Sequence, residues 1–287
     1  MTEMSDRDRE ELARFQEMFA PEDLDPELVP WLDTSPTLGR VLKHPLIFSV
    51  PHSDHLNRMV NQGLRTKREA LDRALAEEDW PTVIWLHERP HRPHALREIA
   101  DRLDDADYWE LLSAVWHDSE NIFQWGDHVR EFFFGVDPDD DAAGEWSGVL
   151  GDRDGRAEGL MDDVDRRAFA LLDDEILVYR GYCRDGTPHG WSWTTDHLIA
   201  LFFARRYAFD LDEQHLVVGR VRKADVIAYT QARGESEVIV DPEKVYGIEE
   251  VPLSATCECG APVDAVARMS HEQHMKHHAT VSEGSDR

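Results

Sequence analysis

Positive charge, lysine and long apolar runs are scarce in this sequence. Its 287 residues hold 31 Lys and Arg against 59 Asp and Glu, a formal net charge of −28, and only five of the cations are lysines. Binding to nucleic-acid phosphates takes clustered Lys and Arg, so this balance argues against broad nucleic-acid binding while leaving a local basic groove open. No run of about 18 apolar residues exists, which predicts that no helix crosses a membrane.

Cysteine is also rare, and its three copies are Cys183, Cys257 and Cys259. An odd and small number of cysteines is a poor basis for a disulfide framework. The first twelve residues, MTEMSDRDREEL, have neither the basic nor the apolar segment of a secretory signal. The expected location of the protein is therefore the cytoplasm.

The first half of the chain has helical periodicity, because its apolar residues recur every three to four positions. Between the first two expected helices, residues 21–58 are rich in proline and are expected to be irregular. The expected helices cover residues 1–20, 59–78, 80–88, 94–103 and 106–118.

The character of the sequence changes after an acidic, glycine-rich stretch at 137–158, which is typical of a linker. A short helix is expected at 160–172, and a second one at 194–208, where Thr195 or Asp196 can cap the N-terminus. Segments rich in Val, Ile and Tyr predict strands at 175–182, 214–229 and 236–241. The expected fold class is α+β, with a helical domain at 1–136, a second domain at 159–255 and a tail at 256–287.

Arg180 is expected at the end of the first of these strands, within Tyr179-Arg180-Gly181. An unpaired buried charge is costly, so this arginine indicates a partner, and guanidinium suits bidentate pairing with phosphate or carboxylate. Gly181 lets a ligand approach the main chain closely. Further along, Ser192 and Thr194 of Ser-Trp-Thr lie on one face of a short expected strand.

Two carboxylates, Glu235 and Glu237, precede the apolar segment 238–240. In a strand they would share one face, and two carboxylates entering an apolar strand are costly unless they are paired or used. Each of these motifs is weak alone, because strand-end arginines, Ser-x-Thr and Glu-x-Glu are commonly ordinary polar positions. Their order, with a helix between the second and the third, is more informative.

The combined pattern resembles the Arg-Ser-Glu class of ADP-ribosyltransferases, variants of which occur in bacterial toxins and phage-encoded enzymes. The likeness rests on aromatic-Arg-Gly, on Ser-x-Thr before a helix with Ala-x-x-Phe (Ala200 to Phe203), and on Glu-x-Glu before β-branched residues. It covers about residues 172–250 and implies an ADP-ribosyltransferase-like split β-sheet. The middle motif departs from the frequent Ser-Thr-Ser, and the spacing from Arg180 to it is short.

The resemblance implies that the chain cleaves NAD+ at its nicotinamide–ribose bond. Arg180 would anchor the NAD pyrophosphate or the adjacent ribose, and Gly181 would hold the nicotinamide carboxamide through main-chain hydrogen bonds. Ser192, assisted by Thr194, would position Glu237, which would bind the ribose 2′-OH and stabilise the oxocarbenium-like transition state. Aromatic residues beside these motifs are further candidates for NAD binding, namely Tyr179, Tyr182, Trp191, Trp193 and Phe203.

Glu235 would orient or deprotonate the acceptor of ADP-ribose, and in this class that residue accompanies modification of arginine. A protein acceptor is therefore favoured over nucleic acid, no membrane partner is expected, and the cytoplasm would be the host's if the chain is phage-encoded. Two other hypotheses stay open. One is an NAD glycohydrolase, with water as acceptor, and the other is a noncatalytic binding or virion-associated protein that retains the fold.

One segment of the sequence has the residue spacing of a zinc-protease motif. The segment His87-Glu88-Arg89-Pro90-His91 has the H-E-x-x-H spacing, which works when a helix brings both histidines to one face. Pro90 removes a helix N–H and clashes with the preceding turn. We interpret the segment as a His/Pro-rich turn.

A second metal-like pattern lies at the C-terminus. Cys257 and Cys259 are followed by His274 and His278, which a helix would place on one face, and four such ligands complete a tetrahedral, structural Zn2+ site. His271 and His277 are alternative ligands. The other interpretation, a His-rich tail with two incidental cysteines, stays open.

Overall fold

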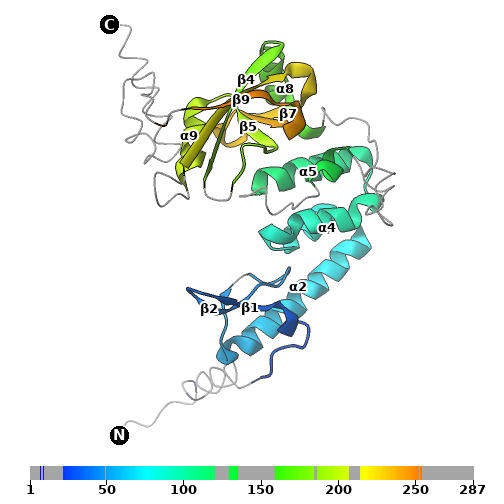
Figure 1. Cartoon of the computed structure of the whole chain (residues 1–287). Coiled ribbons are helices and arrows are strands. Elements are labelled where there is room, and N and C mark those ends of the chain that lie inside the picture. Colours follow the sequence, from blue (N-terminus) through cyan, green and yellow to red (C-terminus); the bar gives the residue numbers. More distant parts are fainter. Residues whose placement is uncertain are drawn as a thin grey trace, which may run out of the picture. The chain divides into compact units, whose positions relative to one another are not determined.

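The computed structural model describes residues 7, 9, 22–48, 50–119, 129–134, 159–183, 186–206, 214–251 and 253. The chain forms two compact units, each of which is described by itself (Figure 1). Unit 1 comprises residues 1–103 and 114–126, and unit 2 comprises residues 104–113 and 127–287. The helix expected at 1–20, apart from Arg7 and Arg9, and the linker expected at 137–158 lie outside the described residues.

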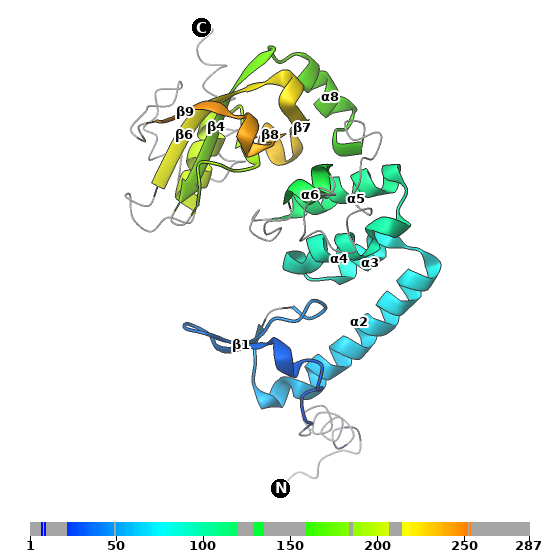
Figure 2. The same cartoon turned by 45° about the vertical axis from the view of Figure 1, so that its right-hand side comes forward.

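Unit 1 is built around the long helix α2 (Asn57–Glu77), which packs against α3 (Trp80–Leu86) (Figure 2). Helix α2 ends because Glu78 adopts the left-handed conformation, with φ of 55°. The next residue, Asp79, caps α3 by accepting a hydrogen bond from the Thr82 amide at 3.2 Å. The backbone of Glu78 and the side chain of Asp79 thus form a sharp turn between the two helices.

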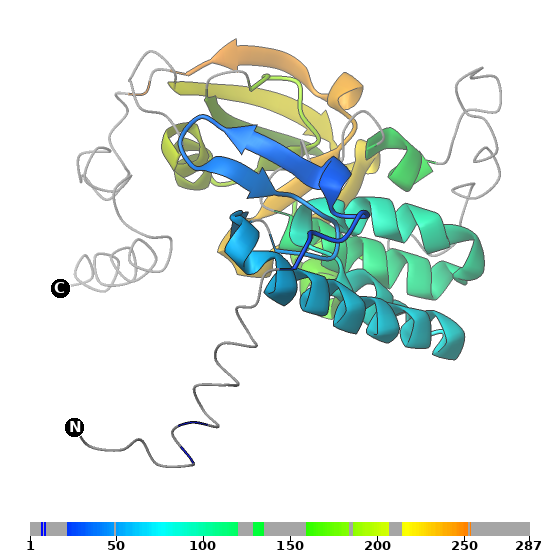
Figure 3. The same ribbon diagram turned by 90° about the horizontal axis from the view of Figure 1, so that it is seen from below.

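A small antiparallel sheet in unit 1 corrects the expectation that residues 21–58 are irregular. Its order is β1 (Leu32–Ser35), β2 (Gly39–Leu42) and β3 (Val50–Pro51), and β1 and β2 form the blue hairpin of Figure 3. The strands have four, four and two residues, too few for alternation to stand out among prolines. Gly39, with φ of +72°, allows the hairpin turn.

The helices expected at 59–78, 80–88, 94–103 and 106–118 are confirmed. None of the helices in the described part of the chain is both long and apolar enough to cross a membrane. Among the described residues, the other elements before the large sheet are 3₁₀ turns at Val29–Trp31, Asp54–Leu56, Arg89–His91 and Ala100–Arg102, and helices α4 (Arg92–Ile99), α5 (Asp105–Asp118), α6 (Val129–Phe134) and α8 (Asp163–Ala170).

Unit 2 contains a six-stranded antiparallel sheet in the order β7-β8-β5-β4-β6-β9. Strands therefore dominate the later part of the chain, as the sequence predicts, and the strand segments expected at 175–182, 214–229 and 236–241 are confirmed. Among the described residues, β4 and β5 are paired at one position, Tyr179 opposite Thr194, which makes this the shortest strand pairing of the sheet. The strands are β4 (Glu175–Cys183), β5 (Ser192–Thr194), β6 (Gln214–Arg222), β7 (Val226–Thr230), β8 (Glu237–Val240) and β9 (Tyr246–Glu250).

Helix α9 (His197–Arg206) packs closely on β4, beside the sheet in Figure 1. A Cβ atom at Gly181 would lie 1.7 Å from the Ala200 carbonyl oxygen, so only glycine permits this approach. The expected cap is confirmed at Asp196, whose carboxylate accepts a hydrogen bond from the Leu198 amide at 2.7 Å. The chain can therefore pass from β5 directly into α9, which fixes both next to β4.

Candidate functional site

The three motifs singled out by the sequence meet on neighbouring strands of unit 2. Arg180 lies on β4, Ser192 opens β5 and Glu237 opens β8, and β5 is the strand between the other two. The Ser192 hydroxyl donates to Glu237 Oε1 at 2.5 Å, and Arg180 Nη1 donates to the Ser192 carbonyl oxygen at 2.6 Å. Arg180 and Glu237, which are 57 positions apart in the sequence, thus belong to one connected polar cluster.

The sheet register explains why the hydroxyls of β5 meet the carboxylate of β8. Thr194 lies directly opposite Glu237, and opposed residues of antiparallel strands project to the same face. Ser192 is two residues from Thr194 and shares that face, as the sequence predicts. The short strand therefore presents two hydroxyl groups to the face that carries Glu237.

Glu237 is a buried carboxylate in an otherwise apolar strand. Its exposed fraction is 7%, and the three following residues of β8 are buried as well. A buried carboxylate requires hydrogen bonds or an opposite charge, which Ser192 and Arg180 supply. Burial lowers the pKa of Arg180 to about 10, and the negative charge of Glu237 opposes that shift, so the guanidinium stays protonated at neutral pH.

The loop before β5 holds the Arg180 guanidinium, and sequence reasoning missed this. Arg180 Nε donates to the Thr187 carbonyl oxygen at 3.0 Å. A Cβ atom at Gly190 would lie 2.2 Å from the Arg180 guanidinium carbon, so the group lies against bare main chain there. The signal available in the sequence was this glycine, two residues before Ser192.

Glu235 does not lie in the strand, which corrects the expectation that it shares a strand face with Glu237. It follows the 3₁₀ turn Ala232–Gly234, and β8 begins only at Glu237. Ser236 between them has φ of +46°, and Arg233 has φ of +60°. Such conformations cost roughly 1–3 kcal/mol each and persist when surrounding contacts hold them.

Several contacts hold this strained turn against the sheet. The Thr194 hydroxyl donates to the Glu235 carbonyl oxygen at 2.6 Å, and the Ser236 carbonyl oxygen accepts from the Thr195 amide at 3.1 Å. At the start of the turn the buried Asp165 of α8 accepts from the Gln231 amide at 2.8 Å. Sequence reasoning missed Asp165, since nothing local marks it as a partner of that turn.

The Glu235 side chain sits in a mostly buried setting next to charged neighbours. Its exposed fraction is 18%, and Arg233 Nη2 lies 2.9 Å from its Oε2. Burial raises the pKa of Glu235, the Arg233 charge lowers it, and the nearby Glu237 charge raises it. A carboxylate whose pKa moves upward becomes a stronger base in its ionised form.

The aromatic candidates for NAD binding have different surroundings. Trp193 is 2% exposed and its indole N–H donates to the Gly190 carbonyl oxygen at 2.7 Å, so its burial disfavours the predicted contact between its ring and NAD. Tyr179 and Phe203 are half-buried, in contact with His197 and Phe202 respectively. Their roles toward NAD stay predictions, as does that of Gly181.

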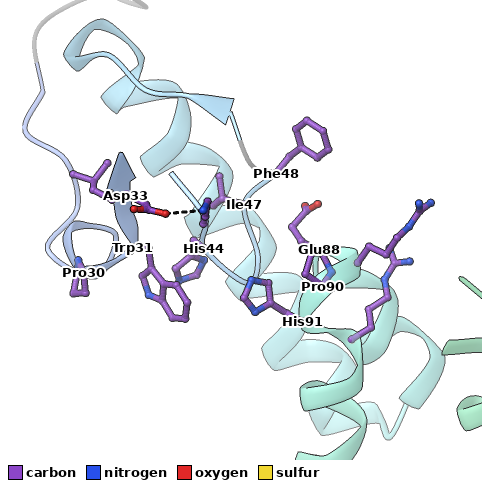
Figure 4. Close-up of a pocket in the computed structure, with 13 residues that line it drawn as sticks. Pro30, Trp31, Asp33, His44, Ile47, Phe48, Glu88, Pro90 and His91 are labelled. Carbon is purple, nitrogen blue, oxygen red and sulfur yellow. Dashed lines mark hydrogen bonds and ion pairs between the residues drawn. The ribbon is translucent and has the colours of Figure 1, made fainter. Parts of the chain in front are cut away.

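The H-E-x-x-H segment forms the turn that its proline predicts. His87 ends α3 and Glu88 is extended, so no helix brings the two histidines to one face. Glu88 and His91 instead line a pocket of about 1090 Å³ together with Trp31 and Phe48 (Figure 4). Asp33 is paired with Lys43 there at 2.6 Å, as the dashed line marks. This pocket of unit 1 presents aromatic rings and paired charges rather than a nucleophile with a base.

Metal binding finds no support in the described part of the chain, where no group of three His, Cys, Asp or Glu side chains is placed to hold an ion. The zinc ligands expected at Cys257, Cys259, His274 and His278, with the alternatives His271 and His277, lie outside the described residues. The zinc site therefore stays a prediction from the sequence.

Histidines near the pocket predict that acid destabilises unit 1. Burial is the main cause that lowers the pKa of His44, His87 and His91 from 6.5. Below that value the unfolded chain binds more protons than the folded one, so stability falls as the pH drops. We expect His91→Gln to reduce the loss of melting temperature between about pH 7 and about pH 5, whereas exposed His55→Gln leaves it unchanged. Equal pH profiles for parent and His91→Gln would refute this.

Comparison with known proteins returned no match, whether to a family model, to a curated protein or to a solved structure. We therefore base the function on the chain's own residues and contacts.

Proposed function

We propose that unit 2 is an NAD-dependent mono-ADP-ribosyltransferase, which cleaves the nicotinamide–ribose bond and transfers ADP-ribose to a macromolecule, with protein arginine as the favoured acceptor. The observation that carries the proposal is the Ser192–Glu237 hydrogen bond of 2.5 Å between β5 and β8, with Arg180 on β4, the other neighbour of β5. A carboxylate held by a serine beside a guanidinium supplies both charges that this reaction uses.

The cluster suits NAD cleavage for electrostatic reasons. Nicotinamide leaves as a neutral molecule while positive charge develops on the ribose carbon. A buried, prepositioned Glu237 carboxylate stabilises that charge more strongly than it stabilises the ground state. Ser192 fixes the carboxylate in place, and Arg180 binds the pyrophosphate or the adjacent ribose, since a guanidinium pairs well with phosphate oxygens.

Glu235 takes the acceptor's proton in the proposed transfer. The turn before β8 keeps its carboxylate near that of Glu237 through the Thr194 bond to its main chain. A carboxylate must be ionised to act as a base. Burial is the largest of the causes that act on the pKa of Glu235, and it raises that pKa. When the pH is lowered, transfer to arginine should therefore begin to decline at a higher pH than it would if the base were an exposed glutamate.

Labelled NAD tests the proposal, with a cell lysate and the small guanidino compound agmatine as acceptors. We expect the full chain to release nicotinamide and to label both acceptors. Glu235→Gln should lower transfer to agmatine about 100-fold, because a general base contributes at least that much, and should retain nicotinamide release. The matched control Glu249→Gln changes an exposed carboxylate of β9 and should alter neither activity.

Three results would change the proposal. Nicotinamide release without labelled acceptor would identify an NAD glycohydrolase, in which water takes the acceptor's place. Absence of both nicotinamide release and label would overturn the enzymatic assignment and favour a noncatalytic binding or virion-associated protein. Equal loss of transfer and release in Glu235→Gln would contradict the separate roles of Glu235 and Glu237.

A further inference from the structure

A guanidinium of the chain itself already lies on the carboxylate that would activate an acceptor. Arg233 Nη2 donates to Glu235 Oε2 at 2.9 Å. The Arg233 side chain is 47% exposed, whereas that of Glu235 is 18% exposed. Arg233 is thus the more solvent-exposed member of the pair, and a macromolecular acceptor must also reach Glu235 from solvent.

The backbone of the turn brings these two side chains together. Arg233 and Ser236 have φ of 60° and 46°, and Gly234 between them has φ of 68°. These left-handed residues fold the chain back on itself within one short turn. The Arg233–Glu235 contact is therefore a consequence of the local fold rather than of two long side chains meeting on an open surface.

The turn is also attached to the rest of unit 2 on both sides of Arg233. Asp165 of α8 holds the Gln231 amide at 2.8 Å before it, and Thr194 of β5 holds the Glu235 carbonyl oxygen at 2.6 Å after it. The same strand β5 carries Ser192, which holds Glu237. One strand thus holds the main chain of Glu235 and the carboxylate of Glu237, and Arg233 contacts the carboxylate of Glu235.

We propose that Arg233 is an intramolecular acceptor, so that the chain transfers ADP-ribose to its own Arg233. This inference rests on the proposed function. Glu235 accepts a proton from the Arg233 guanidinium, and the freed nitrogen lone pair forms a bond to the ribose C1′. The C1′–nitrogen bond to nicotinamide breaks, and its electron pair leaves with neutral nicotinamide. The products are ADP-ribosylated Arg233, nicotinamide and one proton.

Arg206 provides a matched comparison. It is exposed, it ends α9 in the same unit, and its positive charge also acts on Glu235. If any arginine near the carboxylates were modified, Arg206 and Arg233 would be labelled alike. If the hydrogen-bonded position is what selects the acceptor, the label belongs on Arg233.

Mass spectrometry of the full chain after incubation with NAD tests the inference. We expect one ADP-ribosyl group on the peptide that contains Arg233, at a rate independent of protein concentration. Arg233→Lys should lose this label, and Arg206→Lys should keep it. Site mapping on the unsubstituted chain makes the test independent of whether either variant folds.

The same incubations include agmatine and measure free nicotinamide, which separates this inference from the proposed function. Labelled agmatine with an unmodified Arg233 would overturn the inference and leave the transferase standing. Label spread equally over Arg206 and Arg233, or a rate that rises with protein concentration, would also overturn it. A chain that releases no nicotinamide and labels nothing would overturn the proposed function together with the inference.

Discussion

Replacing Glu237 by glutamine is expected to lower the rate of nicotinamide release about 100- to 1000-fold, the loss typical of removing one prepositioned electrostatic group. Glutamine keeps an oxygen that accepts the Ser192 hydrogen bond of 2.5 Å, and it has the same shape. What disappears is the negative charge that stabilises the developing positive charge on ribose. Steady-state release of nicotinamide, measured by chromatography, gives the ratio of rates.

A second buried carboxylate of the same region serves as the control. Asp241 directly follows β8, is 3% exposed and accepts a hydrogen bond from Arg130 Nη1 at 2.5 Å. Asp241→Asn should cost stability, because it leaves Arg130 with a neutral partner, but should keep nicotinamide release. If both substitutions reduce release equally, Glu237 acts through the fold and not through its charge.

Gly190→Ala is expected to raise the KM for NAD about tenfold, equivalent to about 1.4 kcal/mol of binding free energy. The new methyl group would meet the Arg180 guanidinium carbon at 2.2 Å, so the side chain must leave its present position. A guanidinium is the end of a flexible side chain, so the fold can adjust to this change while the anchor for the pyrophosphate is lost. Initial rates over a range of NAD concentrations measure the effect.

Gly181→Ala provides the contrast, because its methyl group would meet main-chain atoms of α9 at 1.7 and 2.5 Å. Main chain cannot swing away as a side chain does, so this variant should lower the melting temperature strongly, with overpacking costs of about 1–3 kcal/mol or more.

An unchanged KM for NAD in a folded Gly190→Ala protein would show that Arg180 does not bind NAD from the position described.

Local sequence patterns predict the parts of the site that depend on neighbours in the chain. Alternation in a three-residue strand places Ser192 and Thr194 on one face, and the sheet register agrees. The same alternation turns Trp193 to the other face, where it is buried. Trp193 is a candidate for NAD binding because it is an aromatic residue beside the motifs, and alternation alone places its ring on the face opposite the two hydroxyl groups.

Contacts across long sequence separations could not be predicted in this way. Asp165 holds the amide of a residue 66 positions away, and neither residue has a neighbour that marks it. Glu235 and Glu237 look like alternate strand positions, but Gly234 and Ser236 adopt left-handed conformations that begin the strand later. Of these two, only the glycine is a sequence signal for such a turn.

The most direct test of the central claim is the release of nicotinamide from NAD by the full, unsubstituted chain, with the Glu237→Gln chain measured in parallel. The cluster of Arg180, Ser192 and Glu237 predicts release that is proportional to the amount of protein and that nearly disappears in the variant. Release at the same rate from both chains, or from neither of them, would contradict the assignment of NAD cleavage to this cluster.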